Sequence, residues 1–320
     1  MKNLNYNIDI NPDINSSKIQ RIKDRIWREK EIWLICIPMI IWVAVFAYYP
    51  MYGLLMAFFD YVPGKAITEC EFMGLYYFKQ FFNSPDFKIV LRNTLVMSFF
   101  RIIFVFPAPI LLALLINEVR NKFFKSAVQT ISYLPHFISW AVTASLLFVF
   151  LSSDGLLSEI LISLGFIDNP INFLGEGKYY WTIFTSANVW KSIGWSSIIY
   201  LSAIAGIDKS QYEAAAVDGM GRFGIMRHIT LPAIKTTIVL LFILQLGGIL
   251  SAGFEEHLLL GSDQTREYWD VIDTYAYRYG IQMGRYSYGV AVSLFKSVIG
   301  VTLVIISNKL TKKHTDMTII

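Results

Sequence analysis

The chain reads Ile207-Asp-Lys-Ser-Gln-Tyr-Glu-Ala-Ala-Ala-Val-Asp-Gly-Met-Gly-Arg-Phe-Gly-Ile-Met-Arg-His-Ile-Thr-Leu-Pro232 between two long apolar segments. Ser210 and Glu213 have the spacing of a capping box, which predicts a helix that begins at Ser210. Gly219 and Gly221 allow a sharp turn after this helix. A second short helix should follow and end at Pro232. Its apolar residues are Phe223, Ile225, Met226 and Ile229.

Apolar segments on both sides of this stretch are long enough to cross a bilayer as helices, which takes about 20 residues. Apolar residues make up 55% of the 320 residues and charged residues 16%, against roughly 25% charged residues in soluble proteins. The mean hydropathy is +0.48. The predicted fold class is an all-α polytopic membrane protein with six transmembrane helices, the first kinked or shortened at Pro50. The six segments are Ile32–Phe59, Thr94–Ile116, Tyr133–Leu151, Tyr179–Ile207, Thr236–Phe254 and Tyr286–Ser307.

The distribution of Lys and Arg predicts the orientation of these spans. The two ends of the chain and the second and fourth loops carry 17 of these residues, and the other three loops carry 8. Because cytoplasmic loops are enriched in Lys and Arg, both termini should be cytoplasmic. The expected organisation is a cytoplasmic N-terminal segment at 1–31, a six-span domain at 32–307 with its loop at 208–232, and a cytoplasmic tail at 308–320.

The segment before the first span has the pattern of a helix that lies on the membrane surface. Lys18–Glu31 places apolar residues on one face and Arg and Lys residues between them, which predicts an interfacial helix. The apolar residues are Ile19, Ile22, Ile26 and Trp27. In the third loop, Leu156–Phe166 is predicted to form another short helix at the membrane interface.

Several classes of function are excluded by what the chain lacks. Cys36 and Cys70 are its two cysteines, too few for a disulfide framework. The four histidines are scattered without metal-ligand spacing, so no metal site and no catalytic residues are predicted. The dispersed basic residues do not indicate binding to nucleic acid.

The loop resembles the EAA loop of binding-protein-dependent ABC importer permeases. The shared pattern is Glu213-Ala214-Ala215, three residues, Gly219, nine residues, Ile229, one residue and Leu231-Pro232, with Asp218 before the glycine. The resemblance implies the type I ABC importer permease fold, with this loop as the coupling helix that sits in a groove of an ATP-binding subunit. The residues it assigns to ATPase coupling are Glu213, Ala214, Ala215, Asp218, Gly219, Phe223, Ile229, Leu231 and Pro232.

Other stretches resemble the carbohydrate-uptake branch of these permeases, for oligosaccharides or polysaccharide fragments. They include Tyr133-Leu134-Pro135-His136-Phe137-Ile138-Ser139-Trp140 and 271–280. The resemblance implies an oligosaccharide substrate, an extracytoplasmic solute-binding protein or lipoprotein that delivers it, and a bacterial plasma-membrane location. The chain has no phosphate-binding loop that would hydrolyse ATP, so it should bind no cofactor, and ATP with Mg²⁺ should bind to two partner ATPase subunits. A second, homologous permease chain is also implied.

Aromatic faces beside hydroxyl and amide groups are the chemistry that binds sugars. The candidates for the substrate path lie in the spans that flank the loop, as in maltose-type permeases: Asn188, Ser192, Trp195, Gln245 and Ser251. Alternatively, Trp190 and Trp195 are packing or membrane-interface residues.

Three spans carry one cation each, Arg101, Lys191 and Lys296. Such residues face the bundle interior, a partner or a water-filled cavity. We favour structural pairing with carboxylates, and recognition of an acidic oligosaccharide such as a uronate is the alternative. A permease for a non-sugar solute, an ion-coupled secondary transporter and an intramembrane protease built on Glu255-Glu256 are the other functions considered. The last would need an arginine where Leu260 stands.

Overall fold

The structure is a computed structural model that describes Trp27 and residues 29–314, with side chains up to residue 309. Contacts divide the chain into two units, Met1–Leu55 and Met56–Ile320. The predicted surface helix Lys18–Glu31 lies almost wholly outside the described residues. The first described helix, α2 (Lys30–Val43), continues through a π-helical turn (Ala44–Tyr48) into a 3-10 helix (Tyr49–Phe58). Helical structure therefore continues past Pro50 to Phe58, so Pro50 does not shorten the span.

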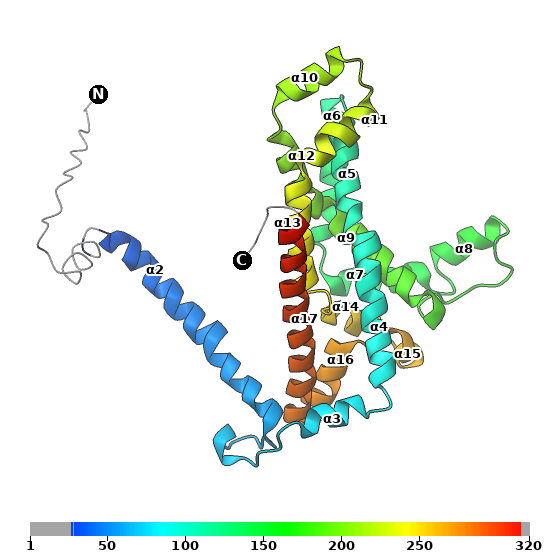
Figure 1. Ribbon diagram of the computed structural model, residues 1–320. Coiled ribbons are helices and arrows are strands. Elements are labelled where there is room, and N and C mark those ends of the chain that lie inside the picture. The colour runs from blue at the N-terminus through cyan, green and yellow to red at the C-terminus, as the bar shows by residue number, and fades with distance from the viewer. Residues whose placement is uncertain (1–26, 28, 315–320) are drawn as a thin grey trace, which may run out of the picture. The chain divides into compact units, whose positions relative to one another are not determined.

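The second unit is built around long helices (Figure 1). α4 (Phe87–Phe100) and α5 (Pro107–Glu118) are joined by a π-helical turn at Arg101–Val105 into one run of 32 residues. α9 (Gly177–Ala205) and α17 (Tyr286–His314) have 29 residues each, or about 43 Å at 1.5 Å per residue. Within the described ranges, four helices are long and apolar enough to cross a membrane, and a fifth candidate is a bent pair that ends in α13 (Lys235–Gly247). α9 overlaps the fourth predicted span but is not among the helices found long and apolar enough to cross a membrane.

Several spans differ from their predicted limits, the third and the fifth among them. The third was expected over Tyr133–Leu151, but α6 (Lys122–Tyr133) and a 3-10 turn (Leu134–Phe137) precede α7 (Trp140–Leu151). The break contains Pro135, which lacks an N–H group, and Ser139 then caps α7 by accepting a hydrogen bond from the Val142 N–H. The fifth span ends at Gly247 rather than Phe254.

Short helices fill the segments between the spans. α3 (Tyr76–Phe82) precedes α4, and α8 (Leu156–Ser163) occupies most of the predicted helix Leu156–Phe166. After Gly253, whose φ is +102°, come α14 (Phe254–Leu260), α15 (Arg266–Trp269), α16 (Ile272–Tyr277) and a π-helical turn (Arg278–Gln282). The loop of interest forms α10 (Lys209–Val217), α11 (Arg222–Ile225) and α12 (Leu231–Ala233). α10 and α11 lie at one end of this unit, and α3, α15 and α16 lie at the other (Figure 1).

Close helix packing holds the second unit together. A Cβ atom on Gly194 of α9 would lie 2.0 Å from the backbone oxygen of Ser132, so α9 touches the backbone of α6 there. Gly280 and Gly289 approach each other in the same way beside α17, and Gly300 of α17 approaches the backbone of Gly247 on α13. Small residues at such contacts are typical of membrane helices. Near the loop end, Ile110, Tyr200 and Ile234 join α5, α9 and the start of α13 in one buried cluster.

Candidate functional site: the loop at 208–232 and the central cavity

The first loop helix begins earlier than the capping-box pattern predicts. α10 starts at Lys209, and its N-cap is Asp208, whose carboxylate accepts a hydrogen bond from the Ser210 N–H at 3.0 Å. This backbone hydrogen bond is the main reason that the pKa of Asp208 is lowered. The predicted start at Ser210 is therefore wrong, because Asp208 is an equally good cap two residues upstream.

The turn after α10 depends on Gly219, whose φ is +74°. The Gly219 N–H donates to the Ala216 carbonyl at 3.1 Å, and the Met220 N–H donates to the Ala215 carbonyl at 2.9 Å. These two bonds form a Schellman motif, in which the residue after the C-cap adopts the left-handed conformation. Gly221 has an ordinary φ of −71°, so of the two predicted turn glycines only Gly219 needs to be glycine for conformational reasons.

The second arm of the loop joins the fifth span directly. α11 passes through a π-helical turn (Met226–Thr230) into α12, and this pair of helices bends by 58° into α13. Pro232 lies in the first turn of α12, which ends at Ala233, one residue beyond the predicted stop. The Tyr212 hydroxyl and the buried Thr230 hydroxyl are 3.2 Å apart, so a hydrogen bond connects α10 to this arm. The loop is therefore linked mechanically to α13 as well as to α9.

The side chains that are exposed on the loop are only partly those predicted to meet the ATPase. Val217 is 88% exposed and Phe223 is 72% exposed, although both are apolar. Glu213, Ala214 and Asp218 are also exposed. Ala215, in contrast, is only 5% exposed, because it faces the loop itself. The predicted contact of the face around Ala215 with a partner stays a prediction, and Val217, which the motif does not include, is the more exposed side chain.

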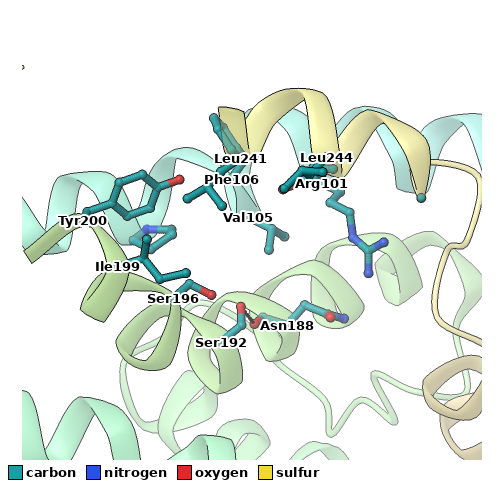
Figure 2. A pocket seen from close by; sticks show the side chains of 13 residues that line it. Arg101, Val105, Phe106, Asn188, Ser192, Ser196, Ile199, Tyr200, Leu241 and Leu244 are labelled. Atoms are coloured by element: carbon teal, nitrogen blue, oxygen red, sulfur yellow. Dashed lines mark hydrogen bonds between the residues drawn. The ribbon is translucent and has the colours of Figure 1, made fainter. Parts of the chain in front are cut away.

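A cavity of about 410 Å³ lies between the π-helical turn of the second span, α9 and α13 (Figure 2). It brings together three predicted substrate-path residues, Asn188, Ser192 and Gln245. Its size falls in the range of small-molecule sites. In Figure 2 the guanidinium group of Arg101 extends toward the side chain of Asn188 on α9. The remaining lining residues are Val105, Phe106, Pro109, Ser196, Ile199, Tyr200, Leu241, Leu244 and Gly248.

Two predicted path residues do not line this cavity. Trp195 stacks in parallel on His136, with ring centroids 4.6 Å apart, and meets Phe137 edge-on. This contact favours the packing alternative for Trp195. The Ser251 carbonyl accepts a hydrogen bond from Arg101 at 2.7 Å, and its hydroxyl accepts one from Lys296 at 3.2 Å. Ser251 thus supports the charged residues around the cavity.

The three span cations have different surroundings. Lys191 is 8% exposed and donates to the carbonyls of Pro135, His136 and Ile138 at the break before α7. Lys296 pairs with Asp273, and the contacts of both lysines favour the predicted structural role. For Lys191 the partners are carbonyl groups rather than the predicted carboxylates.

Arg101 differs from the two lysines because it forms no ion pair with any described residue. One of its five N–H groups donates to the Ser251 carbonyl, which leaves donors for other acceptors. It also lines the cavity. The sequence singles out Arg101 as a charge in a span, but it does not place Arg101 beside Asn188 and Ser192.

Residues 105–314 match the family described as the binding-protein-dependent transport system inner membrane component. The chain belongs to this family. It is a membrane permease of an ABC transporter and not an enzyme, and it crosses the membrane several times.

Relatives and solved structures agree with this assignment. The chain is 44% identical over 287 residues to the protein LplB of Bacillus subtilis, covering 89% of this chain and 90% of the relative. It is 43% identical over 297 residues to the polygalacturonan/rhamnogalacturonan transport system permease protein YteP of the same organism, covering 92% of each. Its structure resembles a chain of a bacterial alginate ABC transporter in complex with an alginate pentasaccharide-bound periplasmic protein. The TM-score is 0.86 at 40% identity, over 93% of this chain and 100% of the other.

Proposed function

We propose that this chain is the permease subunit of an ATP-driven importer for an acidic oligosaccharide or polysaccharide fragment. The observation that carries the proposal is the central cavity, in which Arg101 lies beside the amide of Asn188 and the hydroxyl of Ser192. Amide and hydroxyl groups suit the hydroxyl groups of a sugar, and the apolar side chains around them suit the faces of its ring.

Arg101 is the reason for an acidic rather than a neutral sugar. An arginine within a span is costly unless it pairs with an acceptor or faces water. Arg101 has no ion-paired carboxylate among the residues that the structure describes, whereas Lys296 is paired with Asp273. Glu256 interacts electrostatically with Arg101 without forming an ion pair. A guanidinium group binds a carboxylate through two parallel hydrogen bonds, so a uronate unit in the cavity would supply a directly bonded anion. The relatives named for polygalacturonan/rhamnogalacturonan and alginate transport are consistent with this choice.

The loop of α10 to α12 is the proposed contact with the ATPase. Its outward face carries Val217 and Phe223, two exposed apolar side chains, beside the carboxylate of Glu213. Large exposed apolar side chains at one end of a membrane protein are typical of a protein interface. ATP and Mg²⁺ would bind to two partner ATPase subunits, and movement of this face would reach α13 through the 58° bend.

The rest of the assembly follows from the family and from the charge distribution. We infer a second, homologous permease chain, because a path for an oligosaccharide needs more helices than this chain supplies. An extracytoplasmic binding protein or lipoprotein would deliver the sugar to the end opposite α10. The excess of Lys and Arg supports a cytoplasmic location, in a bacterial cell, for residues 1–31, the loop 208–232 and residues 308–320.

The test measures uptake of trigalacturonate and of neutral galactotriose by proteoliposomes that contain the whole transporter and its binding protein. Wild type should take up the acidic sugar only when ATP is present. Arg101→Gln should reduce uptake of the acidic sugar about 10-fold to 100-fold, the loss expected for about 1.5–3 kcal/mol from a charged hydrogen bond. Arg101→Lys keeps the charge and should lose less. Lys178→Gln is the control, because it removes an exposed lysine of α9 that pairs with Glu176 and does not line the cavity.

Equal uptake of both sugars by wild type and Arg101→Gln would refute the acidic substrate but leave the importer in place. Uptake that follows an ion gradient and ignores ATP would favour a secondary transporter. Uptake of neither sugar, together with ATP hydrolysis stimulated by another solute, would favour the non-sugar importer.

A further inference from the structure

A second pocket lies at the end of the unit opposite the cytoplasmic loop. It has a volume of about 380 Å³ and is lined by residues that precede α3, by α3 itself and by the start of α17. Five tyrosines line it, together with Arg285, Gln80 and Asp60. The tyrosines are Tyr61, Tyr76, Tyr77, Tyr286 and Tyr288. None of these residues takes part in the proposed import mechanism.

The floor of the pocket is rigid. Tyr77 and Tyr288 are 8% and 2% exposed and belong to a buried cluster that also contains Phe81 and Tyr275. The Tyr288 hydroxyl is 2.7 Å from the Tyr275 hydroxyl. The Ser287 hydroxyl accepts a hydrogen bond from the Tyr61 N–H at 2.9 Å, which joins the segment before α3 to α17. The walls are thus held in place before any ligand arrives, and binding would cost little ordering.

The polar groups of the pocket are fixed and include both donors and acceptors. Arg285 donates to the Gln80 side chain at 2.8 Å, and its guanidinium lies 4.5 Å from the centre of the Tyr288 ring. The Asp60 carboxylate accepts a hydrogen bond from the Tyr77 hydroxyl at 2.6 Å and has a second oxygen for another donor. Burial and this bond raise the pKa of Tyr77, so its hydroxyl stays protonated. Arg285 forms no ion pair within the described part of the chain.

We propose that this pocket is a second glycan-binding site, which takes one pyranose unit of an oligosaccharide at the extracytoplasmic end of the permease. Tyr76 is 49% exposed and its ring meets Tyr77 edge-on, so a ring face at the rim is available to a sugar. A carboxylate that accepts hydrogen bonds, a guanidinium that donates them and flat aromatic faces together match the hydroxyl groups and apolar faces of a pyranose. The volume is within the range of small-ligand pockets.

The two sites are far enough apart to bind different units of one chain. Arg101 lies 14 residues after the start of α4 at Phe87, or about 21 Å along a helix. α3 and its pocket precede that start. A long oligosaccharide would therefore occupy both sites, whereas a disaccharide would occupy one. This inference rests on the proposed function only in the choice of probe, because binding is measured without transport.

The experiment measures binding of digalacturonate and hexagalacturonate to the purified whole transporter, without ATP, by isothermal titration calorimetry. Tyr76→Ala and Arg285→Lys should each weaken hexagalacturonate binding about threefold to tenfold, the loss of one aromatic or bidentate contact. Digalacturonate binding to the central cavity should not change. Leu75→Ala is the matched control, since Leu75 is 59% exposed beside Tyr76 but does not line the pocket. Arg101→Gln should weaken the binding of both sugars.

Unchanged hexagalacturonate binding in both pocket variants would overturn the second site. An equal loss of affinity for the two sugars would also overturn the second site, because it would mean a general structural effect. If the variants weaken only the affinity for the sugar-free binding protein, the pocket is a protein contact and the proposal fails. Failure of Arg101→Gln to affect either sugar, with the length-dependent losses retained, would refute the role of Arg101 and leave the second site standing.

Discussion

The turn at Gly219 gives the sharpest prediction about coupling. Its φ of +74° lies in the left-handed region, and a Cβ atom there would meet nothing within 4 Å. Gly219→Ala therefore adds backbone strain and no steric clash. The left-handed conformation costs an L-residue roughly 1 kcal/mol or somewhat more, which lowers the equilibrium constant for forming the turn about fivefold. The helices α10 and α11 should then move less as one body.

Gly221 offers a matched control in the same turn. A Cβ atom on Gly221 would also meet nothing within 4 Å, but its φ is an ordinary −71°, so Gly221→Ala should be neutral. Asn tolerates the left-handed region, so Gly219→Asn should recover most of the loss. The assay is sugar uptake per ATP hydrolysed in proteoliposomes that contain the whole transporter. We expect Gly219→Ala to lower this ratio up to about fivefold. The role of the turn is refuted if Gly219→Ala and Gly221→Ala give the same ratio, or if Gly219→Asn is no better than Gly219→Ala.

Three further predictions concern single contacts. Val217→Arg should leave the amount of permease in the membrane unchanged but reduce its co-purification with the ATPase, because the side chain is 88% exposed on the proposed interface; an undiminished ATPase yield would contradict this. Gly194→Ala should lower the free energy of unfolding by about 1–3 kcal/mol, since the added Cβ would lie 2.0 Å from the Ser132 backbone oxygen. Gly206→Ala is the control, because the nearest atom to a Cβ there is 3.5 Å away. Equal melting temperatures for the two variants would contradict the prediction. Lys191→Gln should destabilise the protein by about 1–3 kcal/mol and impair uptake of acidic and neutral sugars equally, because it removes the ammonium group that donates to the carbonyls of Pro135, His136 and Ile138; a loss confined to the acidic sugar would assign Lys191 to substrate recognition instead.

The sequence predicts the spans because apolar length alone requires them in a membrane. It predicts their ends less well, since local backbone chemistry decides these. Pro135 breaks the third span, and Lys191 of α9 stabilises the break from a distance of more than fifty residues, which no local pattern reveals. The capping box at Ser210 is misleading for a similar reason, because Asp208 competes for the same helix end.

The sequence likewise predicts only part of the candidate site. One cavity contains Asn188, Ser192 and Gln245, which come from the two spans that flank the loop. Arg101 comes from the second span, and only the packing of that span against α9 brings it to the cavity. The EAA pattern identifies the coupling loop, but which of its residues point outward depends on the fold of the loop. Ala215 is therefore buried, while Val217, outside the motif, is exposed.

The importer assembly is tested most simply by affinity purification of the chain from its native membrane in mild detergent, with identification of every protein that accompanies it. We expect an ATPase with a phosphate-binding loop and a second permease chain with its own coupling loop, and we expect Glu213→Arg to reduce the recovered ATPase while the second permease remains. Recovery of a homo-oligomer without any ATPase, unchanged in Glu213→Arg, would contradict the proposed coupling.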